Sequence, residues 1–315
     1  MSALLLSSNA WRPAWLNGLR GRHWVIGLPY AWLLLFFLAP FAVVLNFSLS
    51  QMGLVRPDSL LRQIDGAWQL TLRSSNFSNL LGDGLYFNAY LASLRMAAFT
   101  TLGCLLLGYP FAYFMARAKP ARQGVLLMLV MAPFWTSFLL RVYAWKLLLG
   151  EGGWLAALMD SVGLDHVLLW LGLIEAPGKY MHTPFSLMLG LLYSYLPFMI
   201  LPLYAGLAKM DLRLLEAAHD LGATPWQAFW RITVPLSRGA IAAGSMLVFI
   251  PCIGEYVIPE LLGGPRTLMI GKVLWEEFFN NNDWPMACAV AVVLLLLIVL
   301  PLSWLNRVQD REARA

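Results

Sequence analysis

Residues 215–237 read LEAAHDLGATPWQAFWRITVPLS, a partly charged and sharply punctuated segment between two long apolar runs. Asp211, shortly before this segment, is a residue type that caps the start of a helix. Gly222 readily takes the left-handed conformation in which helices end. These residues predict a short helix over 212–221 that stops at the glycine.

A second helix is predicted directly after this glycine. Thr224 is an N-cap residue, Pro225 suits the first helical position, and Gln227 completes a capping box. Pro235 lacks a backbone donor and clashes with the turn before it, so we expect the second helix to end near residue 232. The segment is therefore predicted to be a hairpin of two short helices.

The first of these helices has two distinct faces. Its apolar face consists of Leu214, Ala217, Ala218 and Leu221, and its charged face of Arg213, Glu216 and Asp220. We expect the apolar face to pack on the protein and the charged face to be offered to a partner. Two alternatives are an ordinary amphipathic helix on the membrane surface and a Glu216 that is solvated or paired with Arg213.

The composition is that of a membrane protein. Hydrophobic residues make up 60% of the chain and charged residues 12%, against about a quarter charged in soluble domains. A span needs roughly 20 apolar residues. Candidate runs lie at 24–55, 96–116, 123–140, 180–208, 239–262 and 284–306. We therefore expect an all-α membrane protein with six transmembrane helices.

The distribution of Lys and Arg predicts the orientation of these helices. Thirteen of the 22 basic residues, but only five of the 17 acidic ones, lie in the segments 1–23, 117–122, 209–238 and 307–315. Short loops rich in Lys and Arg stay in the cytoplasm, so we expect both termini and the hairpin there, on either side of a transmembrane domain over 24–306. The net charge of +5 then reflects topology and not nucleic-acid binding.

The sequence contains no catalytic or metal-binding pattern. HExxH, CxxC and nucleophile-elbow motifs are missing, and Cys104, Cys252 and Cys288 fall inside expected helices, where we expect them to be buried. The stretch GGPRTLMIGKV superficially resembles a phosphate-binding loop, but Arg266 and Val273 replace a required glycine and a required Ser or Thr. We therefore expect no enzyme activity, metal or cofactor in this chain.

The hairpin carries a family motif. Its order is Glu216-Ala217-Ala218, three residues, Gly222, nine residues, Ile232, one residue, and Val234-Pro235. This pattern closely resembles the EAA motif of the permease subunits of binding-protein-dependent ABC importers, with Val234 in place of Leu as the one departure. GEYVIPELLGGP at 254–265 and LMIGKVLWEEFFNNNDWPMACAVAV at 268–292 resemble the putrescine and spermidine branch, most closely its putrescine-type permease.

This resemblance implies a type I ABC importer permease fold in which the hairpin, about 211–235, is a cytoplasmic coupling helix. The implied coupling residues are Glu216, Ala217, Ala218, Gly222, Ile232 and Pro235, of which Glu216 and Gly222 would transmit force. The implied partners are a cytoplasmic ATPase dimer that binds ATP and Mg, a second and different permease subunit, an external polyamine-binding protein and the bilayer of the bacterial cytoplasmic (inner) membrane. The implied function is import of polyamines, putrescine above all.

Glu255 is the main candidate for the substrate path. A polyamine carries cationic amines on a methylene chain, so its path should offer carboxylates and aromatic faces. Glu255 follows Arg238 by seventeen residues, about 25 Å along a helix, which places it in the outer part of the fifth span. A carboxylate at that depth is costly unless it faces protein or water, and this makes it a functional candidate. The alternative is a structural ion pair with Arg95 or Arg141.

Further candidates for this path are Tyr256, Glu260, Trp275, Glu276 and Trp135. The ordinary alternatives are a core aromatic for Tyr256, an exposed loop position for Glu260, and an interfacial belt for the segment of Trp275 and Glu276. Other readings of the whole chain also remain open here. They are a permease for another small cationic or neutral solute, a stand-alone secondary carrier, and a membrane enzyme.

Overall fold

The computed structural model describes residues 19–53, 57–58, 61–64, 67–70 and 73–312. The expected terminal segments 1–23 and 307–315 therefore lie partly outside the described residues. The chain divides into two compact units, one of Met1–Phe77 with Asp283–Leu295, the other of Ser78–Asn282 with Leu296–Ala315. Each unit is described by itself.

The first unit begins with one long apolar helix. It is built from α1 (Leu19–Leu33), a π-helical turn η2 (Leu34–Leu38) and α2 (Ala39–Ser48). A short antiparallel hairpin follows, made of β1 (Leu61–Ile64) and β2 (Ala67–Leu70), and then α3 (Ser75–Gly82) begins. Asn76 donates hydrogen bonds to the carbonyl oxygens of Ser48 at 3.0 Å and Ser50 at 2.7 Å, which ties the start of α3 to the end of α2.

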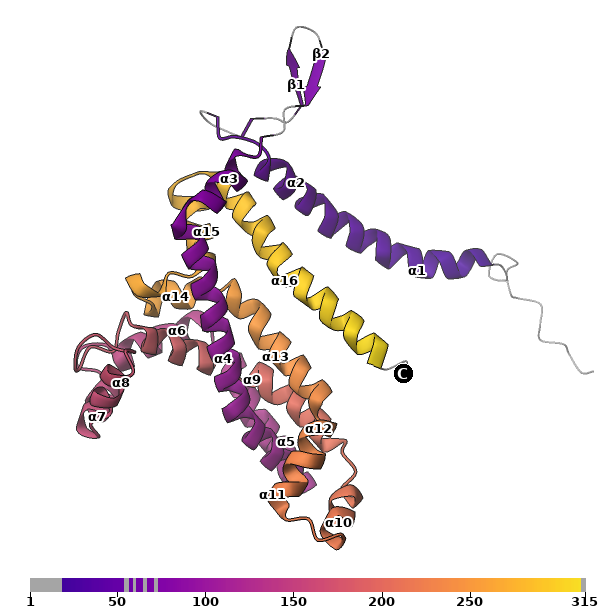
Figure 1. Cartoon of the computed structure of the whole chain (residues 1–315), viewed down its shortest axis with the longest axis vertical. Helices are drawn as coiled ribbons and strands as arrows, with labels where there is room; N and C mark the ends of the chain where they lie inside the picture. Colours follow the sequence, from indigo (N-terminus) through magenta and orange to yellow (C-terminus); the bar gives the residue numbers. More distant parts are fainter. Residues whose placement is uncertain (1–18, 54–56, 59–60, 65–66, 71–72, 313–315) are drawn as a thin grey trace, which may run out of the picture. The chain divides into compact units, whose positions relative to one another are not determined.

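Three long helices pack lengthwise to form the second unit: α4 (Gly84–Arg117), α9 (Pro184–Ala208) and α13 (Arg238–Ile253) (Figure 1). Glycines permit this close packing. A Cβ atom on Gly103 would lie 2.6 Å from Leu192, and one on Gly206 would lie 2.6 Å from Ala240. Close approach at small residues is the usual way in which membrane helices associate, because lipid supplies no hydrophobic drive between them.

The second span starts earlier than the sequence predicts. The sequence predicts this span from the apolar run 96–116, but α4 begins at Gly84 with Asp83 as its N-cap. The Asp83 carboxylate accepts a hydrogen bond from the Leu85 amide at 2.9 Å. This cap starts the helix twelve residues before the uncharged run 96–116, and Arg95 lies within the helix.

Two other expected spans are bent. The third consists of α5 (Pro120–Met131), a 3₁₀ turn η3 (Ala132–Trp135) and α6 (Phe138–Leu149), with an 88° bend before α6. The fifth consists of α11 (Pro225–Ala228), a π-helical turn η4 (Phe229–Thr233), α12 (Val234–Leu236) and α13, with a 65° bend before α13. Prolines near both breaks remove the backbone donors that a continuous helix needs.

The expected number of six spans is not confirmed. Among the described residues, three helices are long and apolar enough to cross a membrane, and the number reaches five if each bent pair is one span. The last helix, α16 (Trp284–Glu312), is not among these five, because its apolar part, Trp284–Val299, is shorter than the candidate spans. The all-helical membrane character of the chain is nevertheless clear.

Short helices and helical turns make up several connections between the long helices of the second unit. They are α7 (Trp154–Ser161), α8 (Leu164–Trp170), α14 (Val257–Leu262), the 3₁₀ turn η5 (Pro265–Thr267), α15 (Ile270–Trp275) and the π-helical turn η6 (Glu276–Asn280).

Tyr180 is fully buried beside α7 and donates a 2.5 Å hydrogen bond to Asp160. Burial, and then this hydrogen bond, raises the pKa of Tyr180 above its ordinary value of 10.

Candidate functional site

The first half of the hairpin is a capped helix, as predicted. Helix α10 spans Arg213–Asp220, one residue shorter at each end than expected. Asp211 accepts a hydrogen bond from the Arg213 amide at 3.0 Å. At the other end Gly222 has a φ of +82°, its amide bonds to the His219 carbonyl at 2.9 Å, and the next amide reaches back to the Ala218 carbonyl at 2.9 Å. This pair of bonds is a Schellman motif, which fixes where α10 ends.

The second half of the hairpin has the predicted capping box. The Thr224 hydroxyl accepts from the Gln227 amide at 3.3 Å, and the Gln227 side chain accepts from the Thr224 amide at 3.0 Å. Pro225 occupies the first helical position of α11. Both helix starts and the intervening stop are thus set by local hydrogen bonds, so the hairpin is a rigid piece.

The predicted end of this second helix near residue 232 is wrong. The helix continues through Pro235 to Leu236, and the break falls at Ser237. A proline ring clashes with the carbonyl four residues earlier, which here belongs to Arg231. The π-helical turn η4 lies directly before the proline, and its wider winding lets the helix pass this position.

Aromatic side chains attach the base of the hairpin to α4. The Phe229 ring meets the rings of Tyr109 and Tyr113 edge-on, with centroids 5.6 Å and 5.9 Å apart. The Tyr109 hydroxyl and the Ser237 hydroxyl lie 2.9 Å apart. The hairpin therefore projects from a fixed base at the end of the unit where α4 ends and α13 begins (Figure 1).

The exposed surface of the hairpin is more apolar than expected. Of the four residues expected to pack on the protein, only Ala218 is buried. Ala217 is exposed, Leu214 and Leu221 are 46% and 89% exposed, and nearby Trp226 is 70% exposed. Glu216 is also exposed, and among the described residues no ion pair joins it to Arg213. Large exposed apolar side chains around a free carboxylate are typical of a surface that a partner covers.

Glu255 lies in a helix break and not within the helix in which it was expected. Helix α13 ends at Ile253, and α14 starts at Val257. The two carboxylate oxygens of Glu255 accept hydrogen bonds from the Tyr195 hydroxyl at 2.7 Å and from the Val257 amide at 3.1 Å. The carboxylate thus caps α14 and is held from α9.

The expected alternative for Glu255, an ion pair with Arg95 or Arg141, is not seen in the described part of the chain. Arg141 instead lies over the rings of Phe134 and Phe138, with its guanidinium carbon 5.7 Å from each centroid. Glu255 is therefore held by neutral donors, which leaves its negative charge uncompensated by a base.

Gly271 positions the break that carries Glu255. A Cβ atom there would lie 2.5 Å from the Gly254 carbonyl oxygen and 2.6 Å from that of Glu255, so α15 runs directly against this backbone. Ser93 of α4 accepts the Ile270 amide at 2.8 Å and holds α15 in place. Sequence reasoning missed Gly271 and Tyr195, because both act through contacts between segments far apart in the chain.

Tyr256 and Trp275 lie together, as their common assignment to a substrate path requires. Their rings stack with centroids 4.4 Å apart and planes 9° apart, and the Phe279 ring lies tilted by 35° to that of Trp275 with its centroid 4.0 Å away. The alternative for Tyr256, a core aromatic, fits this packing as well, because each of the two stacked rings already covers one face of the other.

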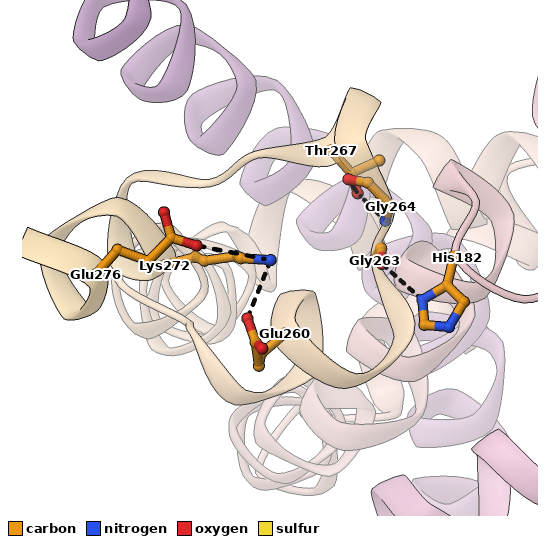
Figure 2. A network of polar contacts seen from close by, with 7 residues as sticks. All are labelled: His182, Glu260, Gly263, Gly264, Thr267, Lys272 and Glu276. Atoms are coloured by element: carbon orange, nitrogen blue, oxygen red, sulfur yellow. Dashed lines mark hydrogen bonds and ion pairs between the residues drawn. The ribbon is translucent and has the colours of Figure 1, made fainter. Parts of the chain in front are cut away.

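Glu260 and Glu276 share one cation, which sequence reasoning missed. The ammonium nitrogen of Lys272 lies 3.0 Å from Glu260 and 3.9 Å from Glu276, and Figure 2 shows Lys272 reaching between them. The signal in the sequence was the spacing of four residues from Lys272 to Glu276, at which opposite charges meet on a helix. One cation offsets only one of the two negative charges, so this cluster keeps a net charge of about −1.

A pocket of about 540 Å³ lies beside Tyr195. Its walls are Phe134, Phe138, Arg141, Ser194, Tyr195, Phe198, Met246, Leu247, Ile250 and Pro251. Trp135 is not one of these residues and is 70% exposed, so the structure does not bring it to the other candidates. The pocket places aromatic faces next to the tyrosine that holds Glu255.

The long apolar helices and bent spans define an all-helical membrane protein, and comparison with known proteins gives its family. Residues 108–315 match the model of the family described as binding-protein-dependent transport system inner membrane component. The chain belongs to this family. It is 40% identical over 271 residues to the spermidine/putrescine transport system permease protein PotB of Salmonella typhimurium SL1344, covering 86% of this chain and 88% of the relative.

Two further similarities agree with this membership. PotB of Escherichia coli K12 is also 40% identical over 271 residues, covering 86% of this chain and 91% of that protein. A crystal structure of a bacterial alginate ABC transporter bound to its pentasaccharide-loaded periplasmic protein matches with a TM-score of 0.65 at 16% identity, covering 95% of this chain and 98% of that chain. At that identity the match shows a shared fold, that of ABC importer membrane components.

Family membership confirms several predictions. The chain is a multi-pass inner-membrane transport component, it is not an enzyme, and it is not the subunit that binds ATP. The readings as a secondary carrier or a membrane enzyme are set aside.

Proposed function

We propose that this chain is the permease subunit of an ATP-driven importer that moves polyamines, putrescine first among them, into the cytoplasm. It works with a cytoplasmic ATPase dimer, a second and different permease subunit and an external polyamine-binding protein. Both termini and the hairpin face the cytoplasm. The identity of 40% to permeases named for spermidine and putrescine supports this substrate class.

The hairpin is the coupling element in this proposal. Glu216 and the exposed apolar residues Leu221 and Trp226 form the surface on which the ATPase sits. Gly222 fixes the angle between α10 and α11, and Ile232 and Pro235 lie in the stem that leads to α13. Because the hairpin is capped at every turn and attached to α4, a movement of the ATPase shifts the stem as one body.

Glu255 is the single observation that carries the substrate assignment. Its carboxylate is oriented by Tyr195 and the Val257 amide but has no basic partner among the described residues. An ammonium group would supply that missing charge, and the aromatic pocket beside Tyr195 would contact the methylene chain. Tyr256 and Trp275 add a stacked aromatic pair next to Glu255. Glu260 and Glu276 form ion pairs with Lys272 and contribute to the path through this lysine. We assign Trp135 no part in the path.

Uptake by the complete complex tests this proposal. Proteoliposomes containing this chain, its paired permease, the ATPase and the binding protein should accumulate radiolabelled putrescine when ATP is supplied. Glu255→Gln should slow uptake strongly while ATPase stimulation by the loaded binding protein persists. Asp83→Asn, which changes a carboxylate that only caps α4, is the matched control and should transport normally.

The outcomes separate the parts of the proposal. A competent complex that imports no polyamine would refute the substrate class, and preferential import of spermidine would refute the preference for putrescine. Loss of folded protein in Glu255→Gln would show that the carboxylate is structural.

A further inference from the structure

A second pocket, of about 600 Å³, lies where α4 ends and α5 begins. It is lined by Phe114, Arg117, Ala118, Lys119, Arg122, Val125 and Leu126. None of these residues belongs to the hairpin or to the surroundings of Glu255. Arg117 is one turn beyond Tyr113, which contacts the hairpin through Phe229, so the pocket and the hairpin are at the same end of the unit.

The charges that line this pocket are all positive. Arg117, Lys119 and Arg122 lie within six residues, and no Asp or Glu joins them in the lining. The guanidinium carbon of Arg117 lies 5.0 Å from the Tyr113 ring centroid, and its Nη2 atom is buried with no hydrogen-bond partner in the described structure. Buried donors are nearly always paired, so this nitrogen is available to an acceptor from outside the described chain.

The turn that presents these charges is held in shape. The Gln123 amide nitrogen donates to the carbonyl of Ala118 at 3.0 Å, and its oxygen accepts from the Tyr204 hydroxyl at 3.1 Å. Lys119 stands at the N-cap of the twelve-residue helix α5 and forms no side-chain cap. The positive end of that helix therefore adds to the charge of the three basic side chains.

The remaining walls are apolar and largely exposed. Arg117 is the last residue of α4, a helix long and apolar enough to span the bilayer. Phe114 and Val125 are exposed, and Leu126 is half-buried. A ligand that fits such walls combines an anionic group with a hydrocarbon chain.

We propose that this pocket binds an anionic phospholipid. The phosphate contacts Arg117, Lys119 and Arg122, and an acyl chain lies along Phe114 and Val125. Basic pockets between membrane helices are known to hold anionic lipid headgroups in this manner. The proposal is independent of the substrate that the transporter carries.

Native mass spectrometry of the purified full chain tests the proposal. With phosphatidylglycerol and phosphatidylethanolamine supplied at equal concentration, the chain should retain phosphatidylglycerol preferentially. The double variant Arg117→Gln/Arg122→Gln should weaken that retention on the order of tenfold. Lys209→Gln is the matched control, since it removes an exposed cation at the end of α9 and outside the pocket.

A second variant distinguishes specific binding of the lipid in this pocket from nonspecific electrostatic attraction to the basic side chains. Val125→Trp keeps every cation but fills the space for the acyl chain, so it should also lose preferential retention. Equal retention of both lipids, or equal losses in Lys209→Gln and the double variant, would overturn the proposal. So would displacement of the lipid by inorganic phosphate at matched concentration, or its loss when the partner subunits assemble on this chain.

Discussion

The Tyr195 hydroxyl in α9 donates a 2.7 Å hydrogen bond to the carboxylate of Glu255 in the break after α13. The other carboxylate oxygen is taken up by the Val257 amide. Both oxygens are therefore oriented before any cation arrives, and a substrate amine would find a carboxylate that needs no rearrangement. Preorganisation of this kind lowers the entropic cost of binding.

Tyr195→Phe should reduce polyamine uptake on the order of ten- to a hundredfold, because a hydrogen bond to a charged group contributes about 1.5–3 kcal/mol and about 1.4 kcal/mol is a factor of ten. The loss should appear mainly in the concentration of polyamine-loaded binding protein that gives half-maximal uptake, measured in proteoliposomes. Tyr193→Phe is the control, because Tyr193 contacts Trp145 through its ring. Equal uptake by wild type and Tyr195→Phe would show that this hydrogen bond has no role in transport.

Gly271→Ala should lower thermal stability and uptake together, since its Cβ atom would overlap the carbonyl oxygens of Gly254 and Glu255. Overpacking of this kind typically costs about 1–3 kcal/mol. Gly124→Ala in α5 is the matched control, because a Cβ atom there meets nothing within 4 Å and alanine favours a helix. Thermal unfolding in detergent, followed by circular dichroism, compares the two variants. A stable and active Gly271→Ala protein would argue against a tight contact at Glu255.

Glu216→Lys should leave insertion and stability unchanged, because the side chain is exposed, but it should abolish stimulation of the ATPase. Reversing the charge opposes whatever basic group on the ATPase the carboxylate meets, and like charges at an interface are strongly disfavoured. The measurement is ATPase activity of the assembled complex with loaded binding protein. Glu151→Lys, an exposed position in the turn after α6, should behave as wild type. Normal coupling in Glu216→Lys would remove this residue from the interface.

A double-mutant cycle of Lys272→Met and Glu260→Gln should give a coupling free energy of about 1 kcal/mol or less. Glu260 is 51% exposed, and water screens ion pairs at such positions. The free energies come from reversible unfolding of the four proteins. A coupling of several kcal/mol would mean that water does not screen this ion pair.

The hairpin was predictable from sequence because its structure is local. Asp211, Gly222, Thr224 and Gln227 each bond to backbone groups within five residues, so residue type and spacing suffice. The error at Pro235 has the same origin, because the local rule says that proline ends a helix and does not anticipate a π-helical turn before it.

The surroundings of Glu255 depend instead on contacts across the chain. The break at Gly254 is matched to Gly271, and the carboxylate is oriented from α9, sixty residues earlier. No spacing rule connects these residues. The number of spans was hard to predict for a related reason, since the 88° and 65° bends arise where packing and proline interrupt apolar runs that look continuous in the sequence.

Tyr109 touches both ends of the stem between the hairpin and α13. Its ring meets Phe229 at the start of this stem, and its hydroxyl lies 2.9 Å from the Ser237 hydroxyl at the bend. One side chain thus contacts the chain on both sides of the stem that leads into the 65° bend, which is called the elbow here. The elbow cannot straighten without breaking either the ring contact or the hydroxyl bond, so its angle is kept by α4 as well as by its own backbone.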